Sequence, residues 1–245
     1  MQKVLAMSNA LLEYLNKRFQ ANRTYISEFK IPGPVITISR EVGCNGVDTA
    51  RKVAERLNRR HLRQEWKVLS KEIFYESAKE LDMEPEKVIS VFKYPGGSSM
   101  KDILNAFGTK KFKSEKKVIK TVNEVIHSFA EEGFCIIVGR AGHIIARDIK
   151  NSLHIKLVAP FDYRINSVMN KKQLNREEAV EFIDKVEKER KLFRKAISKE
   201  ASEDDIFDLY INVSVFNTEQ VLDLIETAAE KKRIFCDYSK QIDFY

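Results

Sequence analysis

The amino-acid sequence predicts an α/β fold in which helices cover both faces of a mostly parallel sheet. Short apolar runs rich in β-branched residues alternate with longer segments whose apolar residues recur at helical spacing. One of these runs leads through a glycine-containing loop directly into a helical pattern. Alternating strands and helices are joined by right-handed crossovers, which make neighbouring strands parallel. Ligands of such sheets bind beyond the carboxyl ends of the strands.

The N-terminal segment is predicted to be a separate helix. Apolar residues recur at near-helical spacing in residues 1–30, and Ile31-Pro32-Gly33-Pro34 ends the pattern. We therefore expect a helix and connector over 1–33, followed by one domain over 34–245. The helix is expected to pack on the core or on a second subunit, which leaves a homodimer open. Its polar face is not strongly basic, which disfavours a role at a membrane surface.

The remaining elements follow from the same periodicities. Strands are predicted at 35–38, 67–69, 134–138, 153–158 and 209–213. Helices are predicted at about 47–57, 71–81, 85–93, 114–131, 161–170, 175–198 and 218–231. The stretch from about 94 to 113 contains Pro-Gly-Gly-Ser-Ser and several lysines, and is expected to be a mobile insertion.

Composition excludes several classes of protein. The chain is 43% hydrophobic, which suffices for a buried core. No apolar run approaches the roughly 20 residues of a membrane span, and no signal peptide pattern is present, so we expect a cytoplasmic protein without membrane contact. Three cysteines and four histidines lack the spacing of a disulfide framework or a zinc site.

The formal net charge of +7 is concentrated in two segments. Residues 110–120 carry six lysines against one glutamate, and residues 185–199 carry seven lysines and arginines against two glutamates. Such segments indicate binding of anions at particular places. Nucleic acid is a poor candidate for the anion, because no helix-turn-helix or aromatic-studded strand pattern accompanies the charge.

The loop between the strand at 35–38 and the following helix is the main candidate for a phosphate site. Gly43 and Gly46 permit positive φ or close approach, and Asn45 tolerates positive φ better than most residues. A strand that turns through such a loop into a helix directs backbone N–H groups and the positive end of the helix dipole at one point. The alternative is a strand-to-helix turn without a ligand, capped by Asp48 or Thr49.

The loop lacks the side-chain cation of the common phosphate-loop motif. It does not match G-x-x-x-x-G-K-[ST], because Val47 follows Gly46 where that motif has lysine. Arg40, or an arginine from elsewhere, would have to supply the charge.

Arginines farther along the chain are candidates for that role. Arg140 directly follows the strand at 134–138, and its planar fork suits a phosphate, although an ordinary ion pair is the alternative. Arg190 lies at helical spacing within an apolar stripe, where a cation requires an anion unless it reaches solvent along the edge. Arg194 lies one turn farther on. Glu41 and Asp48 are candidates to hold magnesium through water, and Glu72 to orient an acceptor, each with capping or ion pairing as the alternative.

Several motifs occur in order between Val35 and about Ile225. They are Ile-Thr-Ile-Ser-Arg-Glu-x-Gly-x-x-Gly at 36–46, Ile-Ile-Val-Gly-Arg-Ala-Gly at 136–142, Val-Ala-Pro-Phe-Asp-Tyr-Arg-Ile at 158–165, Asn-Arg-Glu-Glu-Ala at 175–179, Asp-Lys-x5-Lys at 184–191 and Asp-Leu-Tyr-Ile-Asn at 208–212. In this series the chain resembles the cytidylate kinase-like family, a branch of the P-loop nucleoside monophosphate kinases.

The resemblance implies a P-loop NTPase-like three-layer sandwich with a five-stranded parallel sheet and a helical lid at about 171–200. It implies ATP-dependent phosphoryl transfer, with Mg2+, to a nucleoside monophosphate, most naturally a pyrimidine nucleotide of the cytidylate type, or to a related small acceptor. Arg140 would position the acceptor, and Arg164, Arg190 and Arg194 would close over the transferred group. The ATP phosphates would lie on Arg40, Gly43, Cys44, Asn45, Gly46, Val47, Asp48 and Thr49.

Three positions depart from the pattern of the family. Gly43-Cys44-Asn45-Gly46-Val47 stands where the family often has Gly-Ser-Gly-Gly-Arg, and Ser70-Lys71-Glu72 where it often has Asp-Arg-Glu. Val138 stands where cytidylate kinases proper have an aspartate. These departures favour a second hypothesis, a nucleotide-binding regulator that keeps the fold and lacks turnover.

Overall fold

The computed structural model describes residues 33–60, 64–70, 123, 126–197 and 206–235. The chain divides into two compact units, one of 1–31 with 70–126 and one of 32–69 with 127–245. All elements below belong to the second unit. The predicted N-terminal helix, the helices at 71–81 and 85–93, and the insertion at 94–113 lie outside the described residues. Of the predicted helix at 114–131, residues 123 and 126–131 are described and are helical.

The second unit is built on a five-stranded sheet with the strand order β2-β3-β1-β4-β5. All four strand pairs are parallel, as predicted. The central strand β1 pairs with β3 on one side and β4 on the other, so that Ile36 lies opposite Ile136 and Leu153. The strands are β1 (Val35–Arg40), β2 (Lys67–Leu69), β3 (Cys135–Val138), β4 (Ser152–Val158) and β5 (Leu209–Asn212).

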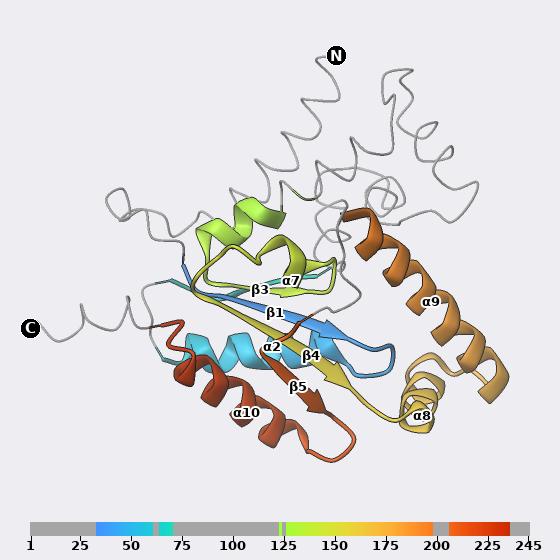
Figure 1. Cartoon of the computed structure of the whole chain (residues 1–245). Helices are drawn as coiled ribbons and strands as arrows, with labels where there is room; N and C mark the ends of the chain where they lie inside the picture. The colour runs from blue at the N-terminus through green and yellow to red at the C-terminus, as the bar shows by residue number, and fades with distance from the viewer. Residues whose placement is uncertain (1–32, 61–63, 71–122, 124–125, 198–205, 236–245) are drawn as a thin grey trace, which may run out of the picture. The chain divides into compact units, whose positions relative to one another are not determined.

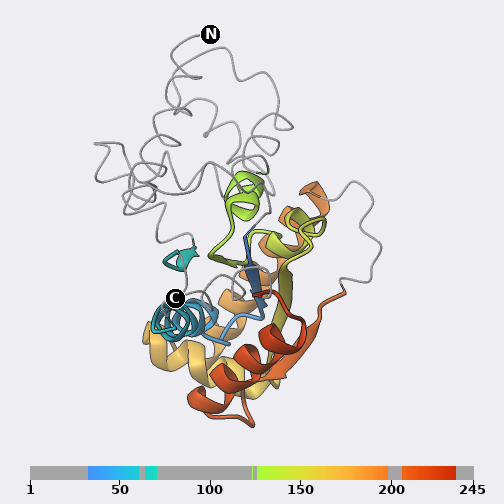
Figure 2. The same cartoon turned by 90° about the vertical axis from the view of Figure 1, so that its left-hand side faces the viewer.

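Two helices cover one face of the sheet (Figures 1 and 2). They are α2 (Gly46–Asn58) and α10 (Thr218–Lys231). The side chain of Arg56 joins them, because its guanidinium lies 2.5 Å from Glu219 and 2.6 Å from Asp223. α10 begins in a capping box, in which the side chains of Asn217 and Gln220 each accept a backbone N–H of the other.

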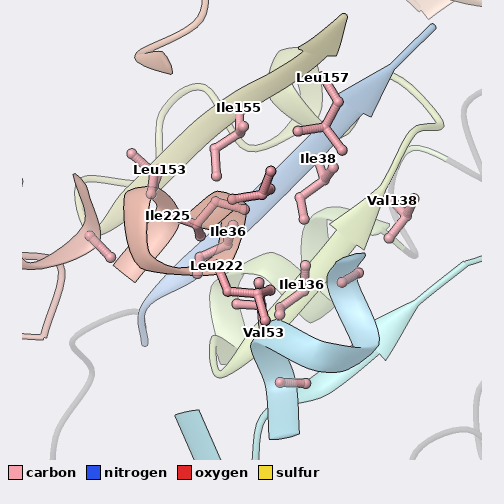
Figure 3. Packing of buried hydrophobic residues seen from close by; sticks show 14 of the residues in the cluster. Ile36, Ile38, Val53, Ile136, Val138, Leu153, Ile155, Leu157, Leu222 and Ile225 are labelled. Atoms are coloured by element: carbon pink, nitrogen blue, oxygen red, sulfur yellow. The ribbon is translucent and has the colours of Figure 1, made fainter. Parts of the chain in front are cut away.

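The main core lies between the sheet and these two helices. Figure 3 shows Ile36, Ile38 and Ile155 beside Val53 of α2 and Leu222 of α10. Each of these side chains is at most 2% exposed. Burial of one such side chain contributes about 1.5–3 kcal/mol. The β-branched runs that form β1 and β3 are therefore strands buried largely on both faces.

The opposite face carries a small buried polar cluster. Thr37 Oγ1 lies 2.9 Å from His154 Nδ1, and Ser152 Oγ lies 3.1 Å from His154 Nε2. Burial lowers the pKa of His154 to about 4, so the imidazole is neutral at pH 7. The short helix α7 (Gly142–Ile145), which the periodicities did not predict, covers this face. A Cβ at Gly142 would lie 2.7 Å from Ile137 Cγ2, so the contact requires glycine.

A helical hairpin lies beyond the carboxyl ends of β1 and β4 (Figure 1). It consists of α8 (Phe161–Lys172) and α9 (Arg176–Ile197). The hairpin has its own apolar cluster, which also includes Val42 from the loop after β1; its buried members are Val42, Ile165, Val168, Ala179 and Ile183. The loop after β1 is therefore packed against the hairpin. Among the described residues, no helix combines the length and apolarity needed to cross a membrane.

Candidate functional site

The loop between β1 and α2 turns tightly through two residues with positive φ. Gly43 has φ +100° and Asn45 is left-handed with φ 47° and ψ 32°. Asn45 is the N-cap residue of α2, and its side chain makes no capping hydrogen bond. The turn thus reverses the chain while the amides at the start of α2 face outward from the helix end.

The first turn of α2 carries backbone N–H groups that the helix itself does not use. A helix leaves its first four N–H groups without an intrahelical acceptor, here those of residues 45–48. Thr49 is the first residue whose N–H bonds within the turn, to the Asn45 carbonyl oxygen at 3.1 Å. Its hydroxyl donates to the same oxygen at 3.3 Å. Asp48 forms an ion pair with Lys171. The side chains of Asp48 and Thr49, the predicted cap residues, thus bind Lys171 and the Asn45 carbonyl oxygen instead of these amides. The positive end of the helix dipole at this position suits a phosphate.

Two side chains, Val47 and Lys171, lie near the position where this loop lacks the usual lysine. Val47, at the position of that lysine, packs against the main hydrophobic core. Lys171, at the end of α8, places its Nζ 2.8 Å from Asp48 Oδ2 and 3.4 Å from Asn45 Oδ1. Its side chain is 60% exposed. A cation from α8 thus lies beside the first turn of α2.

A group of four partly buried charges lies beside the loop. Arg164 Nε lies 3.5 Å from Glu41 Oε2, and Arg164 Nη1 lies 3.7 Å from Glu187 Oε1. The Arg164 side chain is only 13% exposed and lies over the Phe161 ring, with 5.1 Å from Cζ to the centroid. Glu41 Oε2 also accepts the Ala159 N–H at 3.1 Å. Glu41 is therefore engaged in holding β1 to the end of β4.

Arg190 is the fourth member of this group. Its Nη1 donates to the Arg40 carbonyl oxygen at 2.8 Å and lies 3.9 Å from Glu187 Oε1. Burial lowers the pKa of Arg190 from its ordinary value, and the nearby charge of Arg194 acts in the same direction. The anion expected beside this buried cation is Glu187, three residues away on the same helix.

The turn after β3 brings a second arginine to the end of the sheet. Gly139, Arg140 and Ala141 all have positive φ, at 72°, 53° and 54°. Arg140 Cζ lies 5.8 Å from the ring centroid of Phe193 on α9. The side chain of Arg40 runs across Gly139, where an added Cβ would come within 2.0 Å of Arg40 Nη1. The Arg40 side chain thus lies between the loop after β1 and the turn after β3.

The structure brings together most residues that the sequence singled out. Arg40, the loop 43–49, Arg164 and Arg190 form one contiguous region, while Arg140 lies toward Phe193. Glu72 lies outside the described residues. Burial raises the pKa of the Cys44 thiol to about 12, so it stays protonated. No group of three or more His, Cys, Asp or Glu side chains suited to a metal occurs in the described ranges.

Sequence analysis did not single out three side chains of the hairpin that contact the loop. They are Ser167, Lys171 and Glu187. Glu187 entered only through the charge count of residues 185–199. Lys171 and Ser167 belong to no sequence pattern that indicates a site. The one available signal was the spacing of Glu187 and Arg190 by three residues, which places them on the same side of a helix.

The order of the sheet, the glycine loop after β1 and the hairpin beyond the strand ends define an α/β three-layer sandwich of the P-loop NTPase-like class, as predicted. The chain belongs to the cytidylate kinase-like family, whose sequence model matches residues 35–215. Membership of this family points to nucleotide kinase activity.

Individual relatives are distant. The chain is 22% identical over 199 residues to the cytidylate kinase of Methanocaldococcus jannaschii, a match that covers 80% of this chain and 97% of that protein. It is 28% identical over 120 residues to the uronate isomerase of Corynebacterium glutamicum, but that match spans only 23% of the isomerase and 48% of this chain. The crystal structure of an uncharacterized protein from Eubacterium ventriosum has a TM-score of 0.56 at 21% identity, covering 80% of this chain and 98% of that one. This last similarity concerns the fold alone.

Proposed function

We propose that this protein transfers a phosphoryl group from ATP to a nucleoside monophosphate of the cytidylate type, or to a related small acceptor. The observation that carries the proposal is the uncapped first turn of α2 at the carboxyl end of β1 in a chain of this family. The residues present fit a polyphosphate. Gly43 and Asn45 turn the chain, and the N–H groups of residues 45–48 at the start of α2 would bind the phosphates.

The cations around the loop support the same proposal. Lys171 lies at the rim of the loop, and Arg40 runs beside it toward Gly139. These two side chains would offset the charge of the donor phosphates that a loop lysine offsets elsewhere. Arg140, at the end of β3, would hold the acceptor phosphate. Catalysis in this arrangement consists of positioning two phosphates in line and spreading positive charge around them.

Bound ATP with Mg2+ would supply the transferable phosphoryl group and the metal charge. Mg2+ commonly binds through one or two carboxylates together with substrate phosphates and water. Asp48 is a candidate for that role, since it lies in the first turn of α2 and is 49% exposed, and its carboxylate also pairs with Lys171. Glu41 fits it less well, because its carboxylate accepts the Ala159 N–H and pairs with Arg164.

The alternative function is a nucleotide-binding regulator without turnover. The packing of Val47 against the core favours it, because this position then offers no cation to the phosphates. Such a protein would bind ATP through the N–H groups at the start of α2 and would not transfer a phosphoryl group.

A coupled assay with ATP, Mg2+ and a panel of nucleoside monophosphates separates these functions. Transfer to at least one acceptor supports the kinase. Thermal stabilisation by ATP without transfer supports the regulator; at 100 times Kd the stabilisation is about 2.7 kcal/mol. A protein that neither transfers phosphate nor responds to ATP overturns both.

A further inference from the structure

The hairpin α8–α9 binds the backbone of the loop at three successive points. Arg190 Nη1 donates to the Arg40 carbonyl oxygen at 2.8 Å, and Glu187 Oε1 accepts the Val42 N–H at 2.7 Å. Ser167 Oγ donates to the Gly43 carbonyl oxygen at 2.7 Å. The two helices of the hairpin, which are distant from the loop in sequence, therefore bind three backbone groups within residues 40–43.

These contacts are partly buried. Val42 is 5% exposed and belongs to the apolar cluster of the hairpin. A buried amide deprived of its acceptor is costly, which makes the Val42 N–H the contact that matters most here. The loop segment 40–43 thus has little freedom to move apart from the hairpin.

Glu187 is the central member of this arrangement. One of its oxygens, Oε1, accepts the Val42 N–H and also lies 3.7 Å from Arg164 Nη1 and 3.9 Å from Arg190 Nη1. With Glu41, it balances the charges of the two arginines. Loss of its charge would leave Arg164 and Arg190 with Glu41 as the remaining carboxylate of the group.

We propose that Glu187 is a positioning residue that fixes the conformation of the loop by accepting the Val42 N–H, so that the loop and the hairpin move as one body. The meaning of this for phosphate binding rests on the proposed function. The contact itself does not, and can be tested in the free protein.

Hydrogen exchange of the full-length protein without nucleotide provides that test. In Glu187→Met, which keeps length and removes the acceptor, amides in peptides covering 40–48 should exchange about tenfold faster or more. Glu187→Gln keeps an acceptor oxygen at the same place, and should retain most of the protection. Glu181→Met, at an exposed position of the same helix, is the matched control and should leave the loop unchanged.

Each outcome decides the proposal. Unchanged exchange of 40–48 in Glu187→Met overturns it, and so does Glu187→Gln exchanging as fast as Glu187→Met. If Glu187→Met fails to fold, Ser167→Ala tests the same arrangement from α8; faster exchange of 43–48 supports it and unchanged exchange there overturns it.

A separate titration keeps this proposal distinct from the proposed function. ATP binding is measured for the wild type and for Glu187→Met, and about tenfold weaker binding in the variant is expected. A wild-type protein that does not bind ATP contradicts the proposed function. The exchange experiment still decides whether Glu187 fixes the loop.

Discussion

Gly43 lies directly against the backbone of Arg164. A Cβ at Gly43 would come within 2.8 Å of both the Cα and the carbonyl oxygen of Arg164. Backbone atoms cannot rotate away as a side chain can, and φ at Gly43 is +100°, which L residues rarely adopt. The turn of α8 that carries Arg164 and the loop after β1 are therefore in contact only because this position has no side chain.

Replacement of Gly43 by alanine should accordingly damage the loop. We expect Gly43→Ala to lose about 1–3 kcal/mol of stability and to weaken ATP binding at least tenfold, measured by thermal denaturation and by titration. Gly46→Ala is the comparison for stability alone, because Gly46 also lies in the proposed phosphate site and its Cβ would meet the Arg40 side chain, at 3.0 Å from Cγ, instead of backbone. Equal losses in the two variants would argue against a special role of the Gly43 backbone.

Lys171 should contribute to phosphate affinity. Its Nζ lies beside Asn45 and Asp48 at the rim of the loop. We expect Lys171→Ala to weaken ATP binding about five- to tenfold, corresponding to ~1 kcal/mol, with a smaller dependence of Kd on salt. Lys172→Ala removes the same charge from the next residue, whose Nζ lies 4.6 Å from the Phe182 ring centroid, and should have little effect. Equal effects would mean that only net charge matters.

Arg140 should act on the acceptor rather than on ATP. It comes just after β3, the strand that pairs with β1, and does not belong to the loop 43–49. In steady-state kinetics, Arg140→Ala is expected to raise KM for the monophosphate about 10- to 100-fold while KM for ATP changes little. Arg147→Ala, an exposed position in the same segment, serves as control. A change confined to KM for ATP would assign Arg140 to the donor instead.

The buried His154 should make stability depend on pH. Burial lowers its pKa from 6.5 to about 4, so the unfolded chain binds a proton at higher pH than the folded protein does. Between these values the unfolded state holds more protons, and the free energy of unfolding therefore falls as pH decreases from 6.5 to 4. The loss attributable to His154 is up to about 3 kcal/mol.

Urea denaturation at several pH values tests this expectation. His154→Gln removes the titrating ring, and its stability should decline less steeply below pH 6.5 than that of the wild type. His127→Gln, which replaces a partly exposed histidine outside the sheet, should retain the wild-type slope. Parallel curves for all three proteins would show that His154 does not carry the pH dependence.

Local patterns were sufficient to predict the sheet and the loop. The central strands β1 and β3 are rich in β-branched residues because they are buried on both faces, and the observed boundaries of all five strands agree with the predicted ones to within two residues. Gly43 and Asn45 could be recognised because positive φ is a property of single residues. The helix α7 was missed because its four residues are too few to show a periodicity.

The contacts that complete the candidate site could not be predicted in this way. Ser167, Glu187 and Arg190 bind loop atoms from 124 to 150 residues away in sequence. Nothing local to those residues encodes the partner. The apolar stripe around Arg190 correctly indicated a need for an anion, but whether that anion was a ligand or Glu187 depended on the packing of α9 against β1.

The presence of Val42 in the apolar cluster of α8 and α9 bears on protein engineering. Residues 39–49 look like a portable cassette when read along the chain, yet one of their side chains is an integral component of a second, remote hydrophobic nucleus. Transplanting the cassette alone onto another parallel sheet would expose Val42 and lose the scaffold beneath it. A graft intended to carry phosphate recognition would have to include residues 161–197 as well.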